Sequence, residues 1–130
     1  MSIPKIRIDF WITGDLFEPR EVSEILQIEP TKIRRKEEYP LPQTALTSWK
    51  LSTKKEECKA VCWQFEKLIK LLKGKEKLII GMCEQYKLTA SFTVVVEMEA
   101  GDSPELVLTK DIILFIAAIN AEVGFDLYID

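Results

Sequence analysis

Hydrophobic and polar residues alternate strictly near the start of the chain. Between residues 5 and 13 every second residue is apolar, which predicts a strand with one buried face. The apolar face consists of Ile6, Ile8, Phe10 and Ile12, and the opposite face consists of Lys5, Arg7, Asp9, Trp11 and Thr13.

Four later segments also favour strands. Residues 47–52 predict a short second strand that suits a sheet edge, and residues 125–130 alternate as a last strand. Residues 78–86 and 88–98 predict two more strands, with a hairpin around Tyr86 and Lys87.

Two segments follow helical spacing. Residues 19–27 begin with Pro19, which suits the first position of a helix. Residues 58–72 show the i, i+3, i+4, i+7 pattern most clearly, with lysine and glutamate on the opposite side. We expect Gly74 to end this helix in a left-handed conformation.

A third predicted helix, residues 109–121, is apolar on nearly every side. Thr109 is a good N-cap, Asp111 favours the helix dipole, and Gly124 is expected to break the helix. Residues 112–119 contain no polar side chain, so we expect the second side of the helix to be covered. The cover is either another element of the chain or, preferably, a second copy in a homodimer.

The segment 29–47 has no periodicity, and we expect an irregular loop that is more mobile than its flanks. Its basic residues are Lys32, Arg34, Arg35 and Lys36. Arg34 and Arg35 are candidates for binding a phosphate or an acidic partner, because guanidinium groups match such anions. The alternative is a solvated loop whose charge is neutralised by Glu37 and Glu38.

The order of the predicted elements favours one domain over residues 1–130. Its fold class is α+β, a two-layer sandwich with a mixed, mostly antiparallel sheet and helices on one face. This arrangement resembles the ferredoxin-like fold.

Composition and charge exclude several classes. The 130 residues include 18 Lys and Arg against 21 Asp and Glu, and a net charge of −3 argues against binding nucleic acid. The longest apolar run, residues 112–119, is too short to span a membrane, which takes about 20 residues. The first residues do not resemble a secretory signal, so we expect a cytoplasmic protein.

The chain contains no histidine, which removes the usual serine and cysteine triads. Cys58 and Cys62 are spaced to share one ion, but only Cys83 remains as a third thiol, and a closed zinc site needs four ligands. We therefore expect reduced cysteines packed in the core, with metal binding as the weaker alternative. The five glycines are isolated from one another, so no nucleotide or other cofactor is predicted.

The polar side of the first strand is the main candidate site. Arg7, Asp9 and Trp11 share that side, and Asp126 and Tyr128 share one side of the last strand. If the two strands are neighbours, these residues form one polar surface with aromatic anchors for a partner or ligand. The alternatives are a solvated sheet face or an acid–base pair of Asp9 and Asp126.

Several short strings along the chain resemble a bacterial family of small proteins described only as a domain of unknown function, family 4279. They are Phe10-Trp11-Ile12-Thr13-Gly14-Asp15-Leu16-Phe17, Leu26 and Ile28 before Pro30-Thr31, Trp49-Lys50-Leu51, and Phe125-Asp126-Leu127-Tyr128. One departure is Arg35-Lys36-Glu37, where such proteins often carry a Lys-Gly pair. The resemblance implies a cytoplasmic bacterial protein of one domain and supplies no catalytic residues.

Two functions remain open. The first is a non-enzymatic interaction module for an unknown protein partner, including the immunity type that neutralises a toxin. The second is a small enzyme or small-molecule binder that uses Arg7, Asp9, Asp126 and Tyr128 around a pocket. A flat sheet face favours the first and a deep cavity favours the second.

Overall fold

The alternating segment near the start of the chain forms the central strand of a six-stranded sheet, in a computed structural model that describes residues 2–130. The strand order is β2-β3-β1-β5-β6, and β4 pairs with the beginning of β1. The strands are β1 (Lys5–Gly14), β2 (Lys32–Arg34), β3 (Thr47–Ser52), β4 (Glu56–Glu57), β5 (Thr89–Met98) and β6 (Glu122–Ile129).

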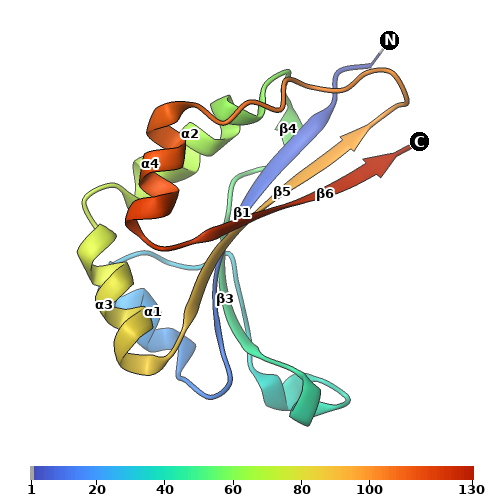
Figure 1. Cartoon of the computed structure of the whole chain (residues 1–130). Helices are drawn as coiled ribbons and strands as arrows, with labels where there is room; N and C mark the ends of the chain where they lie inside the picture. The colour runs from blue at the N-terminus through green and yellow to red at the C-terminus, as the bar shows by residue number, and fades with distance from the viewer. Residues whose placement is uncertain (1) are drawn as a thin grey trace.

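Four helices cover one face of this sheet (Figure 1). They are α1 (Pro19–Leu26), α2 (Val61–Leu72), α3 (Glu76–Tyr86) and α4 (Lys110–Ala118), and the short 3-10 helices Lys36–Glu38 and Pro42–Thr44 lie between β2 and β3. All strand pairs are antiparallel except β5 and β6. The α+β two-layer class with a mixed sheet is therefore confirmed. Its likeness to the ferredoxin-like fold is limited to the two layers, because the six strands and four helices exceed the four strands and two helices of the βαββαβ order.

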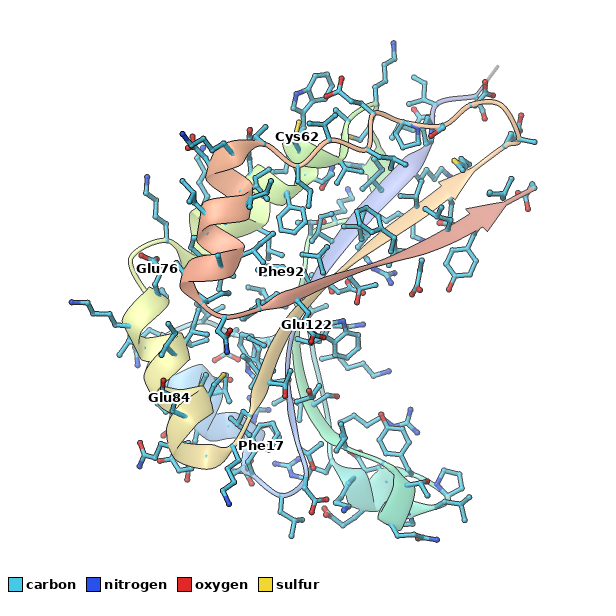
Figure 2. The ribbon with its side chains drawn as sticks, viewed as in Figure 1. Phe17, Cys62, Glu76, Glu84, Phe92 and Glu122 are labelled. Carbon is cyan, nitrogen blue, oxygen red and sulfur yellow. The ribbon has the colours of Figure 1, made fainter. Side chains whose placement is uncertain are left out.

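Aromatic rings at the centre of the sheet join the two layers. Phe10 on β1 lies opposite Phe92 on β5, with ring centroids 5.0 Å apart. Phe65 on α2 packs on Phe92 at the same centroid distance, and Figure 2 shows Phe92 pointing toward the helices. All three side chains are buried, so this stack forms the middle of the core.

A second aromatic contact fixes α1 on the sheet. Trp49 on β3 is fully buried and meets Phe10 edge-on, with ring centroids 6.2 Å apart. Its indole Nε1 donates a hydrogen bond of 2.9 Å to Ser23 Oγ on α1. The indole thus fills core volume and satisfies its one donor.

The expectation of a strand at residues 78–86 is wrong, because this segment is helix α3. A short apolar run fits a strand or a buried helix equally well, and tertiary packing decides between them. Ile79 and Met82 are buried at helical spacing against the core. Lys87, expected in a hairpin, ends the helix in a left-handed conformation with φ of +56°.

The loop expected at residues 29–47 also contains regular structure. β2 pairs with β3 through Ile33 opposite Trp49, so β3 is not a sheet edge and the prediction of an irregular segment is wrong there. β2 could not be predicted from the sequence, because a strand of three residues is too short to show an alternation of apolar and polar side chains. β2 is stabilised by pairing with β3, which lies further along the chain.

The ends of the two longer predicted helices shift as well. α2 begins at Val61, so Cys58 precedes it and donates its N–H to the Pro4 carbonyl oxygen. Gly74 has a φ of +88°, as expected for a residue that follows the helix. α4 is terminated at Asn120, which has a φ of +53°, whereas Gly124 lies inside β6.

The outer side of α4 remains uncovered. Thr109 caps the helix as expected, through a hydrogen bond from the Ile112 N–H. Ile113 and Leu114, however, are 52% and 56% exposed. No other element among residues 2–130 covers them. The expectation that another part of the chain covers this side of the helix is therefore wrong, and the homodimer remains a prediction. Within the same described part of the chain, no helix is long and apolar enough to cross a membrane.

The aromatic stack predicts that substitutions in the core lower the free energy of unfolding more than substitutions in the exposed loop. Phe92→Ala should lower the free energy of unfolding by about 3–5 kcal/mol, because the cavity lies between the sheet and α2. Leu41→Ala, at a side chain that is exposed in the loop, should change it by less than about 0.5 kcal/mol. Urea unfolding measures both, and similar losses in the two variants would contradict this core.

Candidate functional site

The face of the sheet opposite the helices carries the predicted site residues, and we call it the open face. Strand pairing assigns its members, because residues directly opposite one another point to the same side. They are Lys5, Arg7, Asp9, Trp11 and Thr13 on β1, Lys32 and Arg34 on β2, Ser48, Lys50 and Ser52 on β3, Glu57 on β4, Thr89, Ser91, Thr93, Val95 and Glu97 on β5, and Glu122, Gly124, Asp126 and Tyr128 on β6.

Asp9 is a structural residue of this face. Its side chain is 2% exposed, and Arg7 donates to it from Nε at 2.9 Å and from Nη2 at 3.2 Å. Ser52 Oγ on β3 donates a third hydrogen bond at 2.6 Å. The carboxylate therefore ties β1 to β3 and has its charge compensated, which is a poor arrangement for a general base.

The expectation that the first and last strands are neighbours is wrong, because β5 lies between β1 and β6. Val95 separates Arg7 from Asp126 in the same row of the sheet. Tyr128 lies opposite Glu97, near the end of β6. Trp11 lies in line with Glu122, at the start of β6. The structure thus groups Arg7, Asp9 and Trp11 but leaves Asp126 and Tyr128 one strand away, so Asp9 and Asp126 do not form a pair.

A row of three side chains crosses the open face from β2 to β1. We call Lys32, Lys50 and Trp11 the basic row. Lys32 lies directly opposite Lys50, and Lys50 lies directly opposite Trp11 with its Nζ 5.1 Å from the indole centroid. Among residues 2–130 neither lysine forms an ion pair. Two like charges opposite each other destabilise a sheet, so this row holds positive charge at a cost to the fold.

Sequence reasoning missed Lys50 and did not connect Lys32 with Trp11. The alternation in residues 47–52 placed Lys50 on the polar side of its strand. The neighbour relation required β2, which shows no periodicity.

The basic cluster in the loop does not converge on one anion. The Arg34 guanidinium stacks 3.8 Å from the Tyr39 ring centroid. Arg35 Nη2 donates to Glu18 Oε1 at 2.7 Å, and Lys36 pairs with Asp15. The pKa of the Glu18 carboxyl is lowered by the hydrogen bond from the Arg20 N–H and by Arg35. Arg34, Arg35 and Lys36 thus each have a partner of their own, whereas Lys32 belongs to the basic row.

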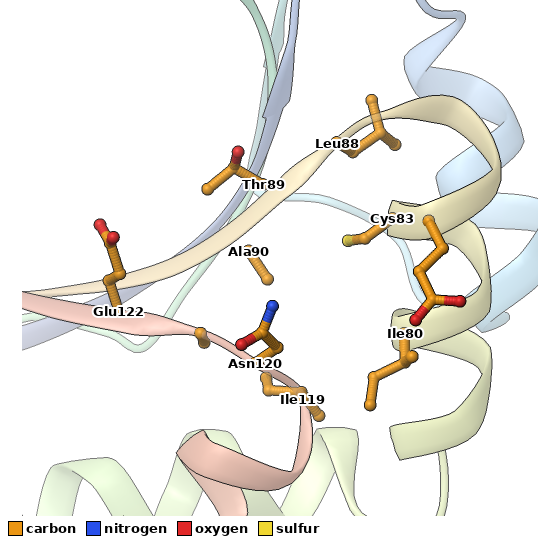
Figure 3. A pocket seen from close by; sticks show the side chains of 10 residues that line it. Ile80, Cys83, Leu88, Thr89, Ala90, Ile119, Asn120 and Glu122 are labelled. Carbon is orange, nitrogen blue, oxygen red and sulfur yellow. The ribbon is translucent and has the colours of Figure 1, made fainter.

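One surface cavity lies beside the sheet, away from the strand residues predicted as a site. A cavity of about 410 Å³ opens between α3 and the turn from α4 to β6 (Figure 3). Ile80, Cys83, Ala90 and Ile119 give it apolar walls, and burial raises the pKa of the Cys83 thiol. Five surface cavities of residues 2–130, this one included, have neither Arg7, Asp9 and Trp11 nor Asp126 and Tyr128 in their lining.

The expected core position of Cys58 and Cys62 is confirmed. Both side chains are buried and both thiols are free. Burial also raises the pKa of the Cys62 thiol, which keeps it protonated near neutral pH.

The fold defines a small α+β protein whose sheet carries helices on one face and the polar open face on the other. The family profile described as "Domain of unknown function (DUF4279)" matches residues 4–130, and the chain belongs to this family. Comparison with curated proteins and with solved structures gives no match.

The contacts of Asp9 predict that substitutions of Arg7 and Asp9 have non-additive effects on the free energy of unfolding. Arg7→Met should lower the free energy of unfolding by about 1–3 kcal/mol, because a buried carboxylate loses its countercharge. The double variant Arg7→Met/Asp9→Leu should be more stable than Arg7→Met, because no buried charge remains.

Arg20→Met is the matched control. Arg20 forms an exposed ion pair with Glu29 at 3.8 Å, and such pairs contribute little. Chemical unfolding of the wild-type protein, Arg7→Met, Asp9→Leu, the double variant and Arg20→Met decides the matter. A double variant as unstable as the sum of its single substitutions would mean that Arg7 does not compensate Asp9.

Proposed function

We propose that this protein is a non-enzymatic interaction module that binds an acidic segment of a partner protein on its open face. The basic row of Lys32, Lys50 and Trp11 carries the proposal. Lys32 and Lys50 lie side by side and repel each other, although the Trp11 ring attracts the Lys50 ammonium, and carboxylates of a partner would relieve the repulsion between the lysines.

Charge across the open face supports a defined orientation for the partner. Lys32 and Lys50 lie on β2 and β3, whereas Glu122 and Asp126 lie on β6 at the opposite side. An acidic segment is attracted to the first half and repelled by the second. Trp11 is half-buried between the two halves and offers the type of anchor that contributes most at interfaces.

The enzyme alternative has less support. Asp9 is engaged by Arg7 and Ser52, and Asp126 lies beyond β5. Five surface cavities of residues 2–130 are lined by residues other than the five strand residues predicted as a site.

Neutralisation of a toxin, as in immunity proteins, is one form that such binding takes, and the partner would then be an enzyme that this protein inhibits. Free cysteines fit a reducing compartment, and we propose the bacterial cytoplasm, as the sequence resemblance implies.

Matched substitutions test the open face. Tagged wild-type protein and its variants are used to capture partners from native cells, and the captured proteins are quantified by mass spectrometry. Trp11→Ala and Lys50→Ala should weaken the binding of a specific partner by tenfold or more, the size expected of an interface hot spot.

The controls are Trp63→Ala and Lys70→Ala, which remove the same side chains from the exposed surface of α2. These variants should keep full binding. Lys50→Ala should also leave thermal stability unchanged or raise it, because it removes a like-charge pair. Equal capture by the Trp11 and Trp63 variants would refute the proposal.

A further inference from the structure

The two edges of the sheet differ in a way that points to a second use of this fold. At one edge, β2 has three residues and carries Lys32 and Arg34, so it is short and charged. At the other edge, β6 has eight residues and contains no lysine, arginine or proline. Proteins blunt free edges with such residues, and a long unprotected edge invites another strand.

The backbone groups that β6 leaves free follow from the strand pairing. The Asp130 N–H donates to the Met98 carbonyl at 3.0 Å, and the Ala100 N–H donates to the Asp130 carbonyl at 3.1 Å. Even-numbered residues therefore bond to β5, and successive residues of a strand alternate in direction. The N–H and C=O groups of Val123, Phe125, Leu127 and Ile129 thus face outward.

These same residues carry the apolar side chains of β6. The side chains of Phe125, Leu127 and Ile129 lie on the helix side of the sheet and are 44%, 45% and 55% exposed. Ile113 and Leu114 on α4 are exposed in the helix layer above the sheet. Figure 1 shows β6 at one edge of the sheet, so free backbone groups and uncovered apolar side chains occur together at that edge.

We propose that a second copy of this chain pairs with this edge, β6 against β6, antiparallel and centred on Phe125. In this register Phe125 lies opposite Phe125 of the second copy, and Val123 lies opposite Leu127 at both ends. Residues with outward backbone groups then form the hydrogen-bonded pairs. The aromatic pair and the aliphatic pairs also bury the exposed stripe.

Charge selects this register. On the open face Asp126 lies opposite Gly124, and Glu122 lies opposite Tyr128, so no like charges lie directly opposite each other. A shift that centres the pairing on Asp126 would set the two Asp126 carboxylates directly against each other, which is unfavourable. A strand that is complementary to itself favours a two-fold pair of identical chains over a foreign strand.

The two-fold axis runs perpendicular to the sheet. Both helix layers then share one side, and the two open faces join into one surface on the other side. This dimer does not depend on the proposed partner binding, since the basic row lies at the far edge of each sheet.

Sedimentation velocity across the micromolar range tests the dimer. The wild-type protein should sediment as a dimer. Phe125→Lys should be monomeric, because it places two positive charges opposite each other. Phe125→Pro should also be monomeric, because it removes the central outward N–H without touching the ladder to β5. Circular dichroism checks that both variants fold.

Leu41→Lys is the control, since it places a lysine at an exposed apolar residue of the loop, and it should remain dimeric. A monomeric wild-type protein would overturn the proposal. So would a dimer that survives in folded Phe125→Lys and Phe125→Pro.

Disulfide crosslinking fixes the register. In the proposed pairing, Phe125→Cys should crosslink to its own copy under mild oxidation, since paired Cα atoms about 5.5 Å apart suit a disulfide. Asp126→Cys and Leu127→Cys should crosslink less. Faster crosslinking of Asp126→Cys would overturn the register centred on Phe125.

Discussion

The antiparallel register of β1 and β5 is the constraint on which the rest of the structure depends. It sets Phe10 opposite Phe92 and Ile8 opposite Val94, and all four side chains are buried beneath the helices. Because side chains alternate with a period of two, this choice also fixes the other face. A slip of one residue would send every charged residue of β1 into the core, so the polar side chains gather on the open face as a consequence of core formation.

Two different surfaces result from covering only one face of the sheet. The open face is polar and charged, and its ion pair between Arg7 and Asp9 is internal to the domain. The β6 edge is apolar on the helix side and has free backbone groups. Charge pairing therefore suits the first surface and strand pairing suits the second. This separation keeps the surface proposed for a partner apart from the edge proposed for a second copy.

The sequence predicted the elements whose period is strict and missed those that depend on distant pairing. Alternation in β1 and helical spacing in α2 were sufficient to predict these two elements, because each has one apolar side and one polar side. The run around Ile79 is apolar without a clear period, and only packing makes it helical. The grouping of Arg7, Asp9 and Trp11 followed from one strand. The basic row did not, because it needs β2 and the strand order, and neither is encoded locally.

Exchange of the tryptophan indole hydrogens with solvent tests most directly the claim that one sheet face is buried and the other is open. Trp49 is fully buried and donates to Ser23, so its Nε1–H should exchange slowly. Trp63 is exposed on α2 and serves as the internal reference for fast exchange. By nuclear magnetic resonance of the labelled protein alone, the Trp11 indole should exchange nearly as fast as that of Trp63. Protection of Trp11 to the level of Trp49 would show that the open face is covered and would contradict this account.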